Sequence, residues 1–282
     1  MSDPLRPDPT AALAAWADRV RLNREQVERR RSAMPQRDDY YAPIAAMFRA
    51  DPHREGDATV DALRSLVRPD DTVVDIGAGG GRYALPLALH CREVIAIEPS
   101  EGMREVLTEG MAEHCIENVR VVDTRWPSDD PLHADVALIS HVGYDIEDFG
   151  PFLDAMEAAA NRLCIAVMLS EPPPSRANPF WEAVHGEPRV PLPALPEFLA
   201  LQLGRGRLCE VSFVEYDAIG FGDEEGILTF LRQQLWIPEG GPEEAKLRAI
   251  LPDYVDIEGD RAEFRRDSGK LGVVRWEPPG AN

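Results

Sequence analysis

Hydrophobic residues in the middle of the chain follow two alternating patterns. Short runs of consecutive apolar residues, many of them β-branched, occupy residues 72–76, 93–97, 119–122, 134–140 and 162–169. Stretches of helical composition lie between them, at about residues 82–90, 101–114 and 148–160. Strands that alternate with helices form a parallel sheet covered on both faces, and near-continuous apolar strands are typical of a sheet buried on both sides. The pattern therefore predicts an α/β fold.

The segment before this core is predicted to be helical. Helical patterns occupy residues 10–34, 40–50 and 57–67, with Thr10 and Asp57 placed to cap the first and the third. We therefore expect residues 1–54 to form an N-terminal helical cap, with the main domain covering residues 55–282.

The composition changes again after the fifth apolar run. Residues 171–196 contain eight prolines, which we expect to exclude both regular helix and central strand. The segment 171–206 is predicted to fold over the sheet as a proline-rich insertion on the substrate side. The remaining patterns predict helices at 194–203, 224–235 and 242–251 and strands at 208–216 and 271–276.

A glycine-rich turn follows the first strand. Asp75 precedes three glycines at alternate positions, in the run Asp75-Ile76-Gly77-Ala78-Gly79-Gly80-Gly81. Glycine lets the backbone turn sharply at the carboxyl end of a strand and approach a ligand without interfering Cβ atoms. The helix that begins after the turn is expected to offer free N–H groups to the bound molecule. The turn predicts a ligand site at this edge of the sheet.

A second signal lies at the end of the next strand. Glu98 stands 19 residues after Gly79, and a carboxylate in this place can accept hydrogen bonds from both hydroxyls of an adenosine ribose. Pro99 follows directly, and Met103 is placed to pack on an adenine face. A surface carboxylate at the start of a helix is the alternative for Glu98.

With these motifs the chain resembles the class I, Rossmann-like S-adenosylmethionine (SAM)-dependent methyltransferases. The resemblance covers about residues 55–170 and rests on three segments: Asp75 to Gly81, Ile97-Glu98-Pro99-Ser100 with Met103, and Ala134 to Ser140. It implies a seven-stranded, mostly parallel sheet that ends in an antiparallel pair, supplied here by the late strands. It also implies SAM as the cofactor and methyl transfer as the activity.

The resemblance also implies roles for individual residues. It implies that Asp75, Gly77, Ala78 and Gly79 bind the methionine moiety and that Glu98 binds the ribose. It assigns the adenine to Asp123 and Thr124. The family often has an acid-rich stretch after the third strand, and this sequence departs from that pattern. Ser140 and His141, at the end of the fourth strand, would face the reacting methyl group.

Four side chains are candidates for contact with the acceptor. His141 is either a general base or a backbone contact only, and Tyr144 has a similar position. Tyr41 lies in the segment that covers the cofactor in similar enzymes, with core packing as the alternative. Trp181 forms either an aromatic wall for the substrate or an anchor for the proline-rich segment.

Composition limits the partners. The formal net charge is -20, with 50 acidic against 30 basic side chains, and such a surface repels phosphate backbones. We therefore expect a small-molecule acceptor and no nucleic acid. The four cysteines show no metal-binding spacing, and the acidic cluster around Asp145 fits a helix start better than Mg²⁺. No metal, membrane span or signal peptide is expected, which suggests a cytoplasmic protein. Oligomeric state stays open.

Two other functions remain open from the sequence. A nicotinamide-dependent oxidoreductase would use a similar turn, but its third glycine position is held here by Arg82. A SAM-binding module without catalysis would carry the same cofactor residues, because binding and catalytic residues are different sets. Methyl transfer to an unidentified acceptor is the predicted function.

Overall fold

A computed structural model describes residues 7–32, 39–128, 130–215, 222–259, 261–265 and 270–280. Within this part of the chain the main sheet has seven strands. They are β1 (Thr72–Ile76), β2 (Glu93–Ile97), β3 (Val119–Val122), β4 (Ala134–Ser140), β5 (Ala160–Leu169), β6 (Glu210–Val214) and β9 (Leu271–Trp276). All seven were predicted from the hydrophobic pattern, most to within a residue or two. The predicted end of β6, at Tyr216, lies outside the described residues.

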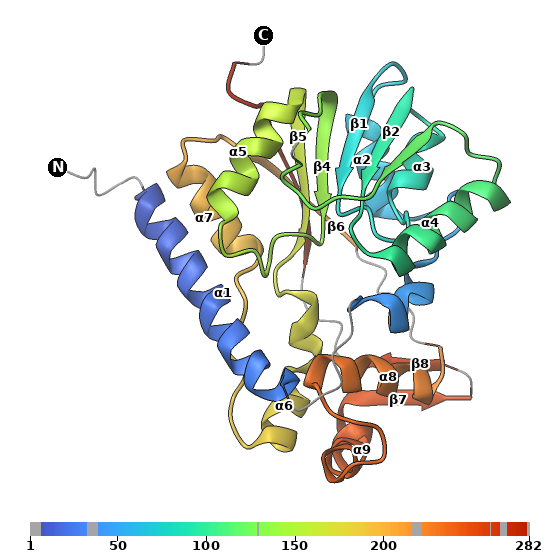
Figure 1. Cartoon of the computed structure of the whole chain (residues 1–282), viewed down its shortest axis with the longest axis vertical. Helices are drawn as coiled ribbons and strands as arrows, with labels where there is room; N and C mark the ends of the chain where they lie inside the picture. Colours follow the sequence, from blue (N-terminus) through green and yellow to red (C-terminus); the bar gives the residue numbers. More distant parts are fainter. Residues whose placement is uncertain are drawn as a thin grey trace.

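The strand order is β3-β2-β1-β4-β5-β9-β6, and Figure 1 shows this sheet in the upper part of the molecule. The first five strands are parallel, and β9 is antiparallel to both β5 and β6. The predicted α/β sheet with a terminal antiparallel pair is therefore confirmed. The order reverses between β1 and β4, and ligands of open α/β sheets bind at the carboxyl ends of strands at such a point.

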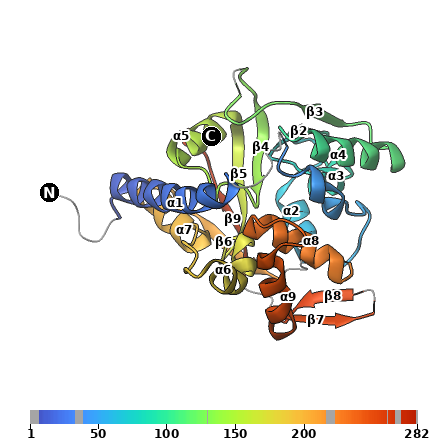
Figure 2. The ribbon, with the colours of Figure 1, turned by 60° about the horizontal axis from the view of Figure 1, so that its bottom comes forward.

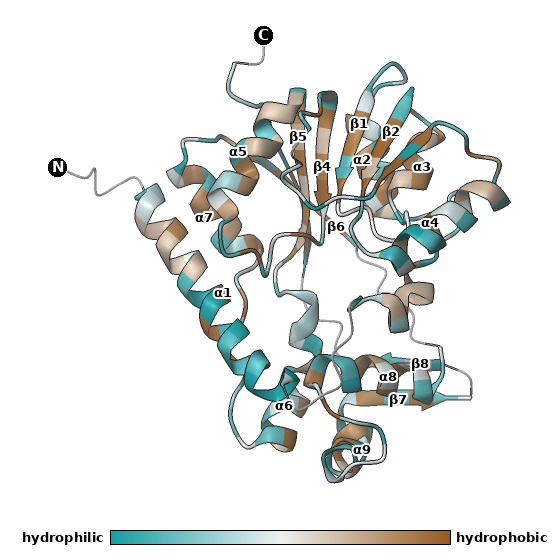
Figure 3. Ribbon diagram, in the orientation of Figure 1, coloured by the Kyte–Doolittle hydropathy of each residue, from teal (hydrophilic) through white to brown (hydrophobic). Residues whose placement is uncertain are grey.

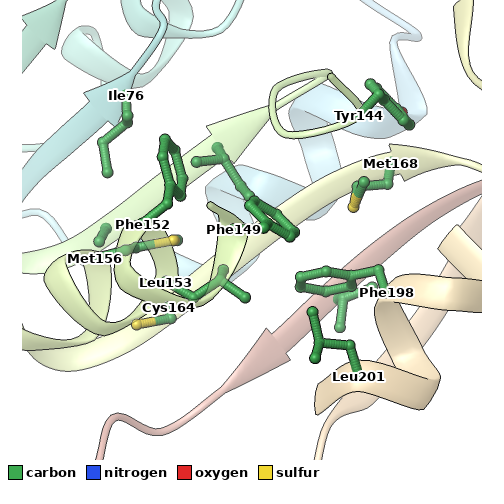
Figure 4. Packing of buried hydrophobic residues seen from close by; sticks show 14 of the residues in the cluster. Ile76, Tyr144, Phe149, Phe152, Leu153, Met156, Cys164, Met168, Phe198 and Leu201 are labelled. Atoms are coloured by element: carbon green, nitrogen blue, oxygen red, sulfur yellow. The ribbon is translucent and has the colours of Figure 1, made fainter. Parts of the chain in front are cut away.

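Helices cover both faces of the sheet. They are α1 (Pro9–Arg31), α2 (Ala58–Leu66), α3 (Ala84–Ala88), α4 (Glu101–Glu113), α5 (Phe149–Ala159) and α7 (Leu195–Gly204). One face carries a core built from α1, α5 and α7, and Figure 4 shows Phe149 of α5 and Phe198 of α7 meeting within it. The other face is covered by α2, α3 and α4. The middle strands of the sheet are mostly brown, hence hydrophobic, in Figure 3, as a layer buried on both sides requires.

The first helix is capped by an acid and packs on α5. Its N-cap is Asp8, which accepts a hydrogen bond from the Thr10 N–H at 2.9 Å, so Thr10 does not cap it as predicted. Pro9 begins the helix because proline is favoured in a first turn. Trp16 stacks on Phe149 with ring centroids 4.6 Å apart. The last two residues of the predicted helix lie outside the described residues.

A second unit lies beneath the sheet in Figures 1 and 2, on the side where β4 and β5 end. It contains the short 3₁₀ helix η2 (Pro173–Ala177), α6 (Asn178–His185), α8 (Glu224–Leu235), α9 (Pro242–Tyr254) and the hairpin strands β7 (Val255–Glu258) and β8 (Arg261–Phe264). Its hydrophobic core is separate from the two cores of the sheet. We call these elements the cap unit.

The cap unit differs from the sequence prediction in two ways. The proline-rich segment contains the helix α6, which the sequence analysis excluded. Pro179 lies in the first turn of α6, where a proline displaces no intrahelical hydrogen bond. The rest of this helix contains no other proline. Most of the unit, moreover, comes from the chain between β6 and β9, and its hairpin was not predicted.

Candidate functional site

The glycine-rich turn after β1 has the backbone conformation that the sequence predicted. Gly77, Gly79 and Gly81 all have positive φ angles, at 76°, 56° and 84°. A Cβ atom on Gly77 or Gly81 would lie 2.6 Å from Val142 or 2.5 Å from Leu107. Beside Gly79 the space is open except for the Met103 sulfur, 3.9 Å from such a Cβ. Gly79 therefore has open space on the side where Gly77 and Gly81 are closely packed.

The backbone N–H groups of the turn itself form hydrogen bonds to the end of β2. The Gly77 and Ala78 N–H groups both donate to the Ile97 carbonyl, at 2.8 and 3.0 Å. The Gly79 N–H donates to Glu98 Oε2 at 2.8 Å. These bonds tie the turn to the end of β2, so the N–H groups of Gly77, Ala78 and Gly79 are already used within the protein. What the turn offers to a ligand is the open space at Gly79 and the carboxyl groups of Asp75 and Glu98.

Glu98 holds two backbone segments in place at once. Its second oxygen, Oε1, accepts a hydrogen bond from the Ser100 N–H at 2.8 Å. The residue is only 6% exposed. Burial raises the pKa of Glu98, although the hydrogen bonds from Ser100 and Gly79 oppose this. Both oxygens keep lone pairs for further donors, as ribose hydroxyls would require.

Asp75 is a buried acid without a counter-charge. It is 2% exposed, and among the described residues its Oδ1 atom has no hydrogen-bond partner. Burial, followed by the nearby charge of Glu98, raises the pKa of Asp75 to about 7. A buried carboxyl group without a partner is costly unless a ligand supplies one. The pair of acids therefore fits a cationic ligand, and SAM carries both an ammonium and a sulfonium charge.

A short segment, residues 39–48, lies across this site, and we call it the strap. It includes the 3₁₀ helix η1 (Ala42–Phe48). Asp39 accepts hydrogen bonds from the Ser100 hydroxyl at 2.8 Å and the Gly102 N–H at 3.0 Å. Although burial opposes it, these hydrogen bonds hold the pKa of Asp39 below its ordinary value. The strap is thereby fixed to the beginning of α4, two residues after Glu98.

The other anchor of the strap is the cap unit. The Tyr40 carbonyl accepts a hydrogen bond from Gln233 Nε2 at 2.7 Å, and the Tyr40 hydroxyl accepts one from Gln234 Nε2 at 3.0 Å. Tyr41 exposes 42% of its surface yet lies near Glu98 and Asp145, whose charges add to restricted solvation in raising its pKa. Tyr41 thus lies within electrostatic range of Glu98. Asp39 had no sequence signal because an isolated acid in a loop has no periodic pattern.

The strap leads to a prediction about cofactor retention. Replacing Asp39 by alanine is expected to weaken S-adenosylhomocysteine (SAH) binding about tenfold, because the loss of these hydrogen bonds costs on the order of 1–1.5 kcal/mol. The change should appear mainly as faster dissociation in stopped-flow measurements. Asp70→Ala, at an exposed acid, is the matched control. Equal dissociation rates for the two variants would show that the strap does not hold the cofactor.

The adenine-side residues are less enclosed. Asp123 is exposed and forms an ion pair of 2.8 Å with Arg104, which also donates to the Glu98 carbonyl at 3.0 Å. Thr124 follows it, with its N–H bonded to the Val122 carbonyl. Met103 is buried at 3% exposure, whereas Pro99 is exposed. Arg104 therefore brings the ends of β2 and β3 together, as an adenine site between them requires.

His141 lies at the end of β4 in a left-handed backbone conformation, with φ of 57°. Burial, followed by the charges of Arg82 and Arg176, lowers the pKa of His141 to about 4. Its imidazole is therefore neutral at pH 7 and able to accept a proton. The neighbouring Ser140 Oγ is buried and has no hydrogen-bond partner among the described residues. These two groups stand where the order of strands reverses.

The other two acceptor candidates lie in hydrophobic cores. Tyr144 is 4% exposed, and its hydroxyl accepts a hydrogen bond from the Leu169 N–H at 2.8 Å; Figure 4 shows it near Met168. Trp181 is 0% exposed in the cap core. Neither placement fits direct contact with an acceptor. Both aromatic rings are used for packing, the alternative that the sequence left open for Trp181.

Metal and membrane features are absent from the described part of the chain. No group of three or more histidine, cysteine or acidic side chains is arranged to hold a metal ion there. No helix in the same residues is long and apolar enough to cross a bilayer.

Comparison with known proteins agrees with this geometry. A family model described as a methyltransferase domain matches residues 74–161. A 23S rRNA (uracil-C(5))-methyltransferase from Bordetella avium is 33% identical over 84 residues, which are 29% of this chain but only 17% of that relative. The chain thus corresponds to less than a fifth of that enzyme's length.

Solved structures share the fold. The YcgJ protein from Bacillus subtilis superposes with a TM-score of 0.53 at 15% identity, covering 79% of this chain and 99% of that one. Magnesium protoporphyrin IX methyltransferase from Synechocystis PCC 6803, with bound SAH, gives 0.50 at 14% identity, covering 63% and 91%. At these identities the likeness concerns the fold. Residues 74–161 thus match a methyltransferase domain, and the sheet around them has the fold of the solved methyltransferase structures.

Proposed function

We propose that this protein transfers the methyl group of SAM to a small-molecule acceptor bound between the sheet and the cap unit. The observation that carries the proposal is the unpaired, buried Asp75 beside the Gly79 cradle and Glu98. A nicotinamide cofactor fits this cradle poorly, because its pyrophosphate would meet two acids and N–H groups that are already bonded.

The chain's own residues have defined tasks in such a reaction. SAM supplies an activated methyl group on a positively charged sulfur. Asp75 would face the cationic methionine end, Glu98 would bind the ribose, and the strap with Tyr41 would limit the entry of water. Methyl transfer from a sulfonium needs mainly positioning and a dry site. An acceptor with a protonated nucleophile would also need a base, and His141, which is neutral at pH 7, is the candidate for this.

The negative charge of the protein and the position of the cap unit and the strap favour a small-molecule acceptor over RNA. Several curated relatives are RNA methyltransferases, so the acceptor class is a question for experiment. The net charge of -20 opposes a phosphate backbone. The strap is hydrogen-bonded to the cap unit, which lies on the side where β4 and β5 end (Figure 2), and we expect this cover to hinder the approach of a long RNA.

Two measurements test the proposal. Calorimetric titration with SAM, SAH, NAD and NADP should give saturable binding of the first two alone. Release of SAH should then be followed with panels of small phenols, amines and carboxylic acids, and with total RNA as a separate substrate. Binding of a nicotinamide cofactor alone would overturn the proposal. Methylation of RNA but of no small molecule would replace the acceptor class, and SAM binding without any turnover would favour a non-catalytic SAM-binding module.

The role of His141 leads to a further prediction. We expect His141→Asn to lower kcat at saturating SAM about a hundredfold, the usual contribution of a positioned base, and to leave the Kd of SAM unchanged. Asparagine tolerates the left-handed backbone, so the loop should persist. Because the pKa of His141 is about 4, wild-type kcat should not fall near pH 6.5. An unchanged kcat in the variant would assign His141 to the pocket wall only.

A further inference from the structure

The short connection between α6 and α7 contains Arg189, to which the proposed binding of the cofactor assigns no role. The backbone around Arg189 is held rigidly by α1. Gln26 accepts a hydrogen bond from the Val190 N–H and donates to the Pro188 carbonyl, both at 2.8 Å. Asn23 donates to the Val190 carbonyl at 2.6 Å. Because both neighbours are fixed in this way, the position of Arg189 is determined by the fold.

The guanidinium of Arg189 lies among groups that do not neutralise it. Its Nη1 donates to the Pro174 carbonyl at 3.0 Å, and its central carbon lies 4.8 Å from the centre of the Trp181 ring. No carboxylate of the described residues pairs with it, although the chain has 50 acidic side chains. The other well-buried arginines differ: Arg205, for example, pairs with both Asp154 and Glu157.

The state of charge of Arg189 follows from its surroundings. Burial lowers the pKa of Arg189 to about 10, and only the nearby Tyr40 opposes this. The side chain is therefore still protonated at pH 7. A partly buried cation without a partner anion is unfavourable unless a ligand provides one.

The contacts of Arg189 place it on the acceptor side of the site. Pro174 belongs to the segment that leaves the carboxyl end of β5, and Trp181 belongs to α6 of the cap unit. Tyr40, on the strap, lies within electrostatic reach of both Arg189 and Asp145, and Asp145 lies in the loop after β4. Residues of the strap, of the cap unit and of the segments that follow β4 and β5 thus lie close to one another around Arg189.

We propose that Arg189 binds the carboxylate or phosphate of an anionic, ring-containing acceptor, whose other end reaches the carboxyl ends of β4 and β5. This inference rests on the proposed function. A guanidinium presents a planar fork of donors that matches either anion in a bidentate manner. The Trp181 ring packs against the guanidinium and holds it in place. Trp181 would thus affect acceptor binding through Arg189 without contacting the acceptor itself. The half-exposed Tyr41 offers an aromatic face for the ring.

The test uses the full chain saturated with SAH and three probes of similar shape: benzoate, phenyl phosphate and benzamide. Each probe is titrated while the Nε–Hε signal of Arg189 is followed by ¹⁵N NMR, the signal being assigned with Arg189→Lys. We expect one of the two anions to shift this signal saturably and to bind at least tenfold more tightly than benzamide. The tighter anion distinguishes carboxylate from phosphate recognition.

Variants separate binding from packing. Arg189→Gln should abolish the preference for the anion, whereas Arg19→Gln, at a surface ion pair with Glu197, should keep it. The Kd of SAH, measured by calorimetry on the same samples, should change less than twofold in both. If Arg189→Gln fails to fold, the wild-type titration decides. An unshifted Arg189 signal with both anions, or an anion preference that survives Arg189→Gln, overturns the inference. Failure of SAH to bind would instead count against the proposed function.

Discussion

Replacing Asp75 by asparagine is expected to make the ligand-free protein more stable at pH 8 and, at the same time, to weaken its binding of SAM at least tenfold. The carboxyl group is buried and has no counter-charge among the described residues. Asparagine keeps the shape of the side chain and removes the charge. Stability and function thus make opposite demands on this residue, as is common where a site is built for a ligand.

The dependence on pH follows from the raised pKa. In the unfolded chain Asp75 titrates near 3.8, and in the folded protein near 7. Its neutral form is favoured in the fold, so the stability present below pH 4 is lost as the pH rises through 7. The pKa difference corresponds to about 4 kcal/mol. A buried asparagine without partners costs part of this, which leaves a net gain of about 1–3 kcal/mol at pH 8.

The same proton is linked to cofactor binding. Below about pH 7 the ligand-free Asp75 carries a proton, which a cationic ligand would displace. The association constant of SAM should therefore fall about fivefold between pH 7 and pH 6 in the wild type. In Asp75→Asn this part of the pH dependence should be missing.

Thermal unfolding and calorimetry at pH 5, 6, 7 and 8 would test these expectations. Asp70→Asn, at an exposed acid before β1, is the control for a lost negative charge. If Asp75→Asn is less stable than the wild type at pH 8, the carboxylate has a stabilising partner in the fold. If it binds SAM as tightly as the wild type, Asp75 does not face the cationic end of the cofactor.

Replacing Glu98 by glutamine is expected to raise the Kd of SAM and of SAH at least a hundredfold. Both oxygens of Glu98 accept backbone N–H bonds, from Gly79 and Ser100. Glutamine has only one acceptor oxygen, so its NH₂ group would face one of these donors. An unpaired buried donor costs on the order of 1–3 kcal/mol, and the ribose would lose one of its acceptors as well. The turn and the start of α4 would both shift away from the ligand.

The matched control for this prediction lies three residues away. Glu101→Gln changes an exposed acid in the first turn of α4 and should leave the Kd of SAM within twofold of the wild type. Circular dichroism would show whether the sheet persists in both variants. A Glu98→Gln protein that is folded and binds SAM normally would contradict the assignment of the ribose to this residue.

The cofactor half of the site could be predicted from the sequence because its parts are local. Strand, glycine turn and acid follow one another within a few residues, and positive φ angles are a property of the glycines themselves. Parallel strands bring their carboxyl ends to one edge of the sheet. Gly79 and Glu98, which are 19 residues apart in the sequence, are therefore hydrogen-bonded in the fold. The same local logic gave the positions of the seven strands, whereas their order became known only from the structure.

The acceptor half was decided by tertiary structure alone. The cap unit joins α6 to segments that follow β6, and only its hydrophobic core shows that they belong together. Tyr144 and Trp181 were placed at the acceptor by their position along the chain, but their burial follows from contacts with distant elements. Asp39 and Arg189 lie in loops without periodicity, and their partners are about 60 and 15 residues away. Long-range packing, which no local pattern encodes, therefore positions these residues.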